Sequence, residues 1–234
     1  MKTRNSRRRF GLAFFLISLV LSVRGWALDI EGVVKMNPPW PEPVSLTVDE
    51  KHAHDCGPAK TSPKLILSED GFVVNAVVRL EGNFPKGEDP DPGKDIILDQ
   101  IQCEFVPHVV LLPLGAALTI LNSEEILHNV RAFDESATML FNDAMPKKGQ
   151  TLKKRFSRPG RLVVRCGIHP WMHALVVVQA HRYYSLSDDR GRFRIANIPP
   201  AKYNLRVWHE VLGDLVRPVG PEDASVVLTY SSLT

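Results

Sequence analysis

Short apolar or alternating stretches dominate this chain, and residues that favour turns separate them. Almost no stretch keeps the 3.6-residue period of an amphipathic helix. Short strands at regular spacing are typical of β-sandwiches. The pattern therefore predicts an all-β protein. Its expected strands include Phe72–Leu80, Phe105–Leu112, Ala117–Leu121, Leu162–Val164, Leu175–Val178, Phe193–Ile195 and Tyr203–Val207.

The first residues have a different pattern. Arg7, Arg8 and Arg9 give a basic start, an apolar stretch runs over 10–23, and small residues follow up to Ala27. This layout predicts a secretory signal peptide over residues 1–27. The apolar stretch is short for a membrane span. The basic start fits a twin-arginine export signal as well as an ordinary one, and both lead to the periplasm or another exported location.

The charge of the chain changes when that segment is set aside. The whole sequence has 29 basic and 26 acidic residues, for a net charge of +3. Residues 28–234 keep 23 basic and 26 acidic residues, for a net charge of −3. Net charge therefore gives no support for a nucleic-acid partner. No later stretch is long and apolar enough to span a membrane.

One short run carries most of the chemistry. Cys166, His169 and Met172 stand at positions i, i+3 and i+6, and a further histidine, His128, lies upstream. One thiolate, two imidazoles and a weak axial thioether form the ligand set of a type 1 (blue) copper site. These residues predict one mononuclear copper that alternates between Cu(I) and Cu(II). Zinc is the rival metal, and the methionine argues against it.

The cysteine count is odd for an exported protein. If Cys166 is held as a copper thiolate, Cys56 and Cys103 remain as a pair. An oxidising compartment would then favour a disulfide between them. The sequence leaves open whether they form it.

Residues from about 100 to 180 resemble the cupredoxins. The motifs are Phe105-Val106-Pro107, Asn122, His128-Asn129, Pro159-Gly160 and the Cys-x-x-His-x-x-Met loop. The spacing of that last loop resembles amicyanin, whereas plastocyanin-like members have a longer gap before the methionine. The resemblance implies a Greek-key sandwich over residues 98–180.

The same resemblance implies roles for residues around the copper. Asn129 would tie the two ligand loops together and donate a hydrogen bond near the sulfur of Cys166. His169 would reach the surface through an apolar patch, and a redox partner protein would dock near His169, Pro170 and Trp171. Trp171 either contributes to this patch or packs inward. Arg165 departs from the family, which often has an aromatic residue or histidine there.

The flanking residues resemble a carboxypeptidase regulatory-like domain, a small transthyretin-like β-sandwich. The motifs are 188–193 and 198–205, with 30–34 and 74–80 fitting its first strands. This implies that 28–97 and 181–234 form one discontinuous sandwich into which the copper domain is inserted. The alternative is two domains in series. Together the pieces resemble bacterial exported proteins described as methylamine-utilisation-like or plastocyanin-like.

The remaining histidines give weaker signals. His52 and His54 alternate with Cys56 and form either a metal site or an exposed loop that ends in a disulfide. His108 lies in an expected strand and could touch a domain interface. His173, His181 and His209 are most simply polar surface or interface residues, so none is predicted as a ligand.

We therefore expect an exported copper protein that carries single electrons and is not an enzyme. The alternative is a non-catalytic binding or scaffold protein with a structural or transported copper. A copper enzyme would need a second copper with an open position, and beyond His52 and His54 the sequence offers no convincing second cluster. The sequence shows no nucleophile–base motif or phosphate loop.

Overall fold

The computed structural model describes residues 27–85 and 95–233, so the predicted signal peptide lies outside the described residues except for Ala27. Strands make up most of the described part, with one short helix, α1 (Glu50–Cys56). The predicted all-β fold class is confirmed. Within 27–85 and 95–233, no helix has the length and apolar character that crossing a membrane requires.

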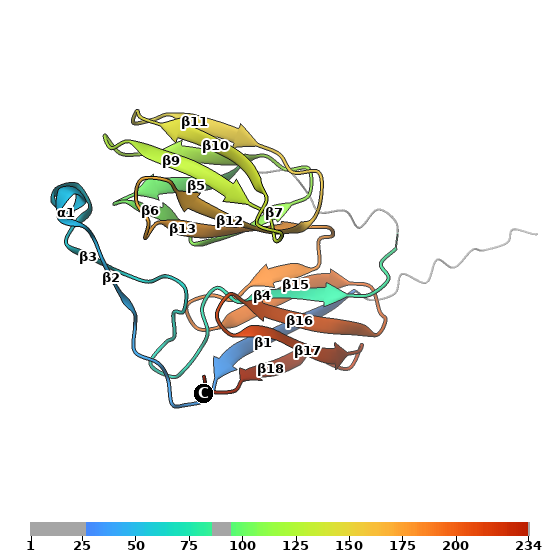
Figure 1. Ribbon diagram of the computed structural model, residues 1–234. Helices are drawn as coiled ribbons and strands as arrows, with labels where there is room; N and C mark the ends of the chain where they lie inside the picture. Colours follow the sequence, from blue (N-terminus) through green and yellow to red (C-terminus); the bar gives the residue numbers. More distant parts are fainter. Residues whose placement is uncertain (1–26, 86–94, 234) are drawn as a thin grey trace, which may run out of the picture.

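Nine strands between residues 96 and 179 form the first of two sandwiches (Figure 1). The order across one sheet is β10 (Met139–Met145), β9 (His128–Phe133), β12 (Gly160–Cys166), β13 (His173–Gln179), β7 (Val109–Pro113). The order across the other is β11 (Thr151–Lys154), β8 (Leu118–Asn122), β5 (Ile96–Ile101), β6 (Glu104–Val106). Buried and less buried residues alternate along β9 and β12, so one side of each strand faces the other sheet.

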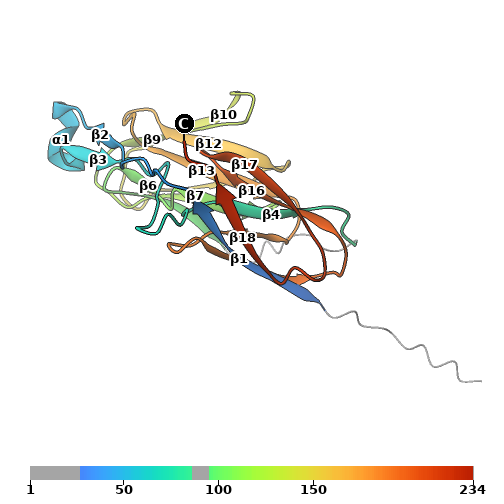
Figure 2. The ribbon, with the colours of Figure 1, turned by 90° about the horizontal axis from the view of Figure 1, so that it is seen from below.

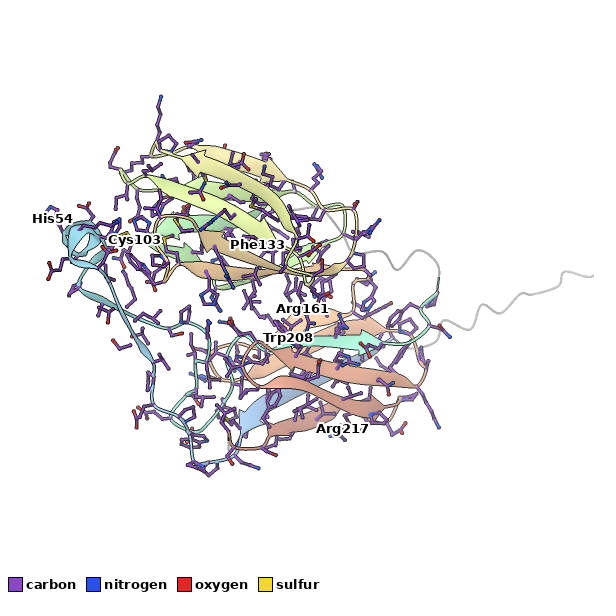
Figure 3. All side chains as sticks on the ribbon, in the orientation of Figure 1. His54, Cys103, Phe133, Arg161, Trp208 and Arg217 are labelled. Carbon is purple, nitrogen blue, oxygen red and sulfur yellow. A yellow bond between two sulfur atoms is a disulfide. The ribbon has the colours of Figure 1, made fainter. Side chains whose placement is uncertain are left out.

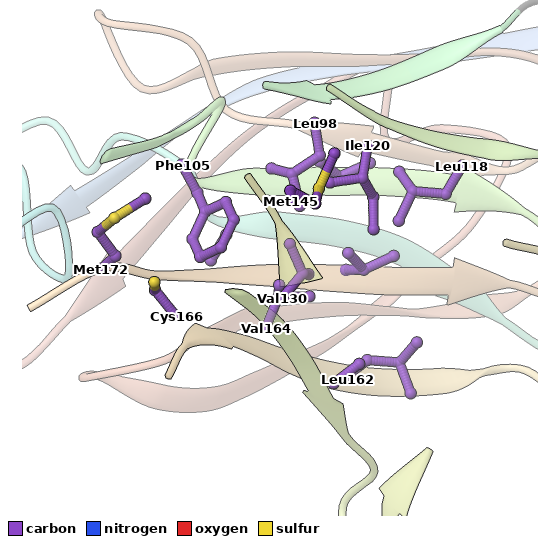
Figure 4. Close-up of a cluster of buried hydrophobic side chains, with 14 of the residues drawn as sticks. Leu98, Phe105, Leu118, Ile120, Val130, Met145, Leu162, Val164, Cys166 and Met172 are labelled. Atoms are coloured by element: carbon purple, nitrogen blue, oxygen red, sulfur yellow. The ribbon is translucent and has the colours of Figure 1, made fainter. Parts of the chain in front are cut away.

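The core of the first sandwich runs from aliphatic side chains to the predicted copper ligands. Leu98, Leu118 and Ile120 are fully buried between the sheets. Cys166 and Met172 lie beside each other at one end of this core (Figure 4). The sulfur ligands are therefore part of the packed interior.

The second sandwich is built from strands near both ends of the described chain. One sheet has the order β15 (Arg192–Ile198), β1 (Leu28–Met36), β18 (Ser225–Tyr230). The other has the order β14 (Tyr184–Leu186), β4 (Val77–Glu81), β16 (Tyr203–His209), β17 (Gly213–Val219). Strand β1 pairs antiparallel with β15 and parallel with β18, which lies beside it in Figure 2. The division into 28–97, 98–180 and 181–234 stays a prediction, and β5 already begins at Ile96.

The two sandwiches pack against each other through apolar side chains. Val109, Leu175 and Val177 of the first share a buried cluster with Val77 of the second, and Trp208 packs against it. Strand β13 is thus covered on both faces, which explains its uninterrupted apolar sequence. The Arg161 guanidinium lies 4.6 Å from the centroid of the Trp208 ring across this junction (Figure 3).

The segment between β1 and β4 leaves the second sandwich and reaches the first (Figures 1 and 2). It carries β2 (Ser45–Thr47), α1 and β3 (Ala59–Thr61). Asp49 caps α1 by accepting a hydrogen bond from the His52 amide at 3.1 Å, and Gly57 ends it with a φ of 82°. We call residues 37–76 the covering segment.

Two expected strands are shorter or broken. Within 72–80 the strand β4 begins only at Val77, because Asn75 has a φ of 63°, which extended backbone does not adopt. The stretch 105–112 is divided into β6 and β7 at Pro107, which has no N–H to donate to a neighbouring strand.

The core of the second sandwich offers a test of the fold. Leu80 is fully buried there, so Leu80→Ala should lower the free energy of unfolding by about 3 kcal/mol in urea denaturation. Val227 is 59% exposed on β18, so Val227→Ala should change it by less than about 0.5 kcal/mol. Equal effects of the two variants would contradict the placement of Leu80.

Candidate metal centre

Three of the predicted ligands meet at one end of the first sandwich. His128 begins β9, Cys166 ends β12, and His169 lies in the loop that leads into β13. The Nδ1 atom of His169 lies 3.1 Å from Nδ1 of His128 and 3.6 Å from Sγ of Cys166. All three residues are almost completely buried, and their donor atoms lie within 4.8 Å of one another.

The fourth predicted ligand belongs to the same loop. Met172 is 2% exposed and lies beside Cys166 in Figure 4. Its amide donates to the His169 carbonyl at 3.0 Å, and its carbonyl accepts from the Cys166 amide at 3.2 Å. These two bonds close the loop and hold the thioether next to the thiol.

Three backbone amides point at the sulfur of Cys166. The amides of Asn129, Ile168 and His169 lie 3.5, 3.4 and 3.5 Å from Sγ. Hydrogen bonds to a sulfur stabilise its thiolate form. The donation by Asn129 comes from its backbone, whereas its side-chain amide donates to Asn142 at 2.8 Å.

Gly167 allows the loop after β12 to come this close to the start of β9. Its amide donates to the Asn129 carbonyl at 3.2 Å. A Cβ at Gly167 would lie 2.4 Å from the side-chain oxygen of Asn129, too close for any side chain without a shift. Asn129 therefore ties the start of β9 to the loop after β12 mainly through its backbone.

Glu124 orients the ring of His128, and the sequence analysis missed this residue. Its carboxylate lies 2.9 Å from Nε2 of His128 and accepts a hydrogen bond from the Cys103 amide at 3.0 Å. A proton on Nε2 donated to this carboxylate leaves the Nδ1 lone pair facing the centre. The i, i+4 spacing of Glu124 and His128 is a signal that could have pointed to the pair.

The surroundings of Cys166 and His128 change the pKa values of both side chains. Burial alone would raise the pKa of the Cys166 thiol, but hydrogen bonds from His128, His169 and nearby amides lower it to about 5. Burial would lower the pKa of His128, but the Cys166 sulfur and the Glu124 carboxylate raise it to about 9. Both pKa shifts favour the charged forms of these two side chains.

His169 does not reach the surface, which corrects the sequence-based expectation. It is 1% exposed because the ring of His52 on α1 stands edge-on at 4.7 Å between centroids. Trp171 packs inward, 8% exposed, and donates from Nε1 to the Cys103 carbonyl at 3.0 Å. Of the three expected docking residues, only Pro170 is exposed.

A disulfide attaches the covering segment to the first sandwich beside the centre. Cys56, at the end of α1, is bonded to Cys103, and both are buried. His52 lies 2.5 Å from the carboxylate of its cap residue Asp49, which fixes the ring over His169. His54 points away from the centre and is exposed, so His52 and His54 do not form the alternative metal site considered from sequence (Figure 3).

The donors fit a soft redox metal. Two imidazole nitrogens and a thiolate face one point, with a thioether adjacent, and this set suits both Cu(I) and Cu(II). The surrounding sandwich fixes the donors, and α1 shields them from water. A copper ion held by these donors would change its oxidation state with little movement of its ligands.

Comparisons with known proteins give structural neighbours only. No family model and no curated protein matches the sequence. A purple cupredoxin from Nitrosopumilus maritimus is 23% identical, over 36% of this chain and 100% of its own, with a TM-score of 0.33.

Two other solved structures are similarly distant. A variant of amicyanin in its reduced Cu(I) form is 27% identical, over 45% of this chain and 99% of its own, with a TM-score of 0.34. A copper-containing nitrite reductase from Thermus scotoductus is 21% identical, over 37% of this chain and 22% of its own, with a TM-score of 0.32. At TM-scores this low, none of the three carries an argument about the metal, activity or partner of this chain.

The disulfide can be tested by thiol counting and by stability. The unfolded, unreduced protein should react as one thiol, Cys166, and as three after reduction. A Cys56→Ala/Cys103→Ala variant should lose about 4 kcal/mol of unfolding free energy, because the bond closes a loop with a sequence separation of 47. Reductant should destabilise the wild type by a similar amount and leave this variant unchanged. Three reactive thiols before reduction would contradict the pairing.

Proposed function

We propose that this chain is an exported type 1 copper protein that carries single electrons between redox partners. The observation that supports it is the convergence of Cys166 Sγ with the Nδ1 atoms of His128 and His169, beside the buried Met172. Copper bound by this set would alternate between Cu(I) and Cu(II) and so supply a one-electron couple.

Each residue has a separate task in this proposal. Cys166 would supply the thiolate, His128 and His169 the two equatorial nitrogens, and Met172 the axial sulfur. Glu124 would hold the His128 ring in the tautomer that leaves Nδ1 free.

The proposal extends to the compartment and the domain organisation. A disulfide between Cys56 and Cys103 suits an oxidising compartment such as the periplasm. We also propose that 98–180 is a cupredoxin unit inserted in a transthyretin-like sandwich made of 28–97 and 181–234. The burial of all four predicted copper ligands, which keeps a substrate away from them, supports an electron carrier and not an enzyme at this centre.

The partner would approach over the covering segment. Because α1 lies on His169, a docking protein would meet Pro170 and the outer face of α1, with His52 between the partner and His169. Electron exchange would therefore pass near the His52 ring.

Copper loading tests the centre. The protein given Cu(II) should bind the ion and show the intense visible absorption of a thiolate–copper bond. Cys166→Ser should lose this absorption, and His54→Ala, which removes an exposed histidine 96% accessible on α1, should keep it. A colourless wild type after loading, or an unchanged band in Cys166→Ser, would rule out the proposed site.

Electron exchange separates a carrier from a scaffold that only stores copper. Voltammetry of the copper-loaded protein should show a reversible one-electron wave, because the buried donors are held by the sandwich in both oxidation states. The wave should be absent in Cys166→Ser and present in His54→Ala. Bound copper without a reversible wave would favour the binding or scaffold alternative.

A further inference from the structure

A second group of side chains of metal-ligating types lies where the two sandwiches meet. His108, between β6 and β7, and His173, the first residue of β13, come from the first sandwich. Glu210, in the turn between β16 and β17, comes from the second. Their donor atoms lie within 4.8 Å of one another, and the side chains are 6%, 12% and 14% exposed, respectively.

The carboxylate of Glu210 contacts both rings, one with each oxygen. Its Oε1 is in short contact with Nε2 of His108, and its Oε2 lies 3.3 Å from Nε2 of His173. The rings meet edge to face, with centroids 4.7 Å apart. The three groups therefore surround one small volume.

The hydrogen bond at Nδ1 of His108 indicates that its Nε2 atom directs a lone pair into that volume. Its Nδ1 lies 3.3 Å from the His173 carbonyl, which can only accept a hydrogen bond. A neutral His108 ring thus has its proton on Nδ1 and a lone pair on Nε2, directed at the Glu210 carboxylate. A lone pair and a carboxylate need a positive charge between them, which either a proton or a metal ion supplies.

Two imidazoles and one carboxylate form a recognised metal-binding set. Proteins use three such ligands for zinc and for non-haem iron and leave a further position open for water or substrate. Here the His173 side chain also lines a cleft of about 920 Å³, formed with Trp40 and Leu65 of the covering segment and with Trp171. A ligand entering this cleft would meet the cluster at His173.

We propose that His108, His173 and Glu210 bind a divalent transition-metal ion between the sandwiches, with an open position toward the cleft. The ion would clamp Glu210 of the second sandwich to two side chains of the first. It would also lie next to the copper ligand loop, because His173 directly follows Met172 in the chain.

The test uses protein that lacks the copper thiolate, so it does not depend on the proposed electron carrier. Cys166→Ser protein is equilibrated with Co(II) or Zn(II), freed of loose metal by gel filtration and analysed for metal content. We expect about one ion per chain. Glu210→Gln in the same background should lose this ion, and Glu69→Gln, an exposed carboxylate that lines the same cleft, should keep it.

Thermal unfolding gives a second readout that a simple ion pair would not move. Zn(II) should raise the Tm of Cys166→Ser protein and leave Cys166→Ser/Glu210→Gln unchanged. His173→Gln serves as a second variant should Glu210→Gln fail to fold. No retained metal, or equal retention in the site variants and in Glu69→Gln, would overturn the proposal and leave the cluster as a proton-bridged contact between the sandwiches.

Discussion

The sulfur of Cys166 accepts hydrogen bonds from three backbone amides, and the whole centre depends on this arrangement. The amides come from the start of β9 and from the loop that follows β12, which lie together at one end of the sheet. Gly167 permits the contact because it has no Cβ to strike Asn129. Backbone geometry thus positions the predicted metal ligands, which would lower the rearrangement that metal binding or electron transfer would require.

Three parts of the chain that are far apart in sequence build or support the centre. The first sandwich supplies the donors, and the covering segment places His52 against His169. The second sandwich holds both ends of the covering segment, since β1 precedes it and β4 follows it. The second sandwich therefore supports the centre indirectly. It holds the ends of the covering segment, and it packs on the first sandwich through the apolar junction and the contacts of Glu210.

Local sequence patterns predicted much of this structure, but they could not predict its long-range contacts. Alternation located β8, β12, β15 and β16, and the spacing of Cys166, His169 and Met172 predicted side chains that do converge with His128. That they bind copper stays a prediction. Helix α1 was missed because seven residues are too few to show a period, although Asp49 and Gly57 are ordinary signals for its ends. The burial of His169 follows from that missed helix and its attachment to Cys103, so no pattern near residue 169 could reveal it.

The parallel pairing of β1 with β18 has a consequence for biosynthesis. Strand β1 is made early, yet its two neighbours, β15 and β18, are among the last strands to leave the ribosome. The strands from β5 to β13 have all their sheet partners among themselves and can assemble sooner. During that interval most of β1 has no sheet partner, because only its end, from Val34 to Met36, bonds to the earlier residues 71–73. Unpaired strand edges are the kind of surface on which nascent chains associate wrongly. A chaperone that shields this strand would protect the chain at its most vulnerable stage.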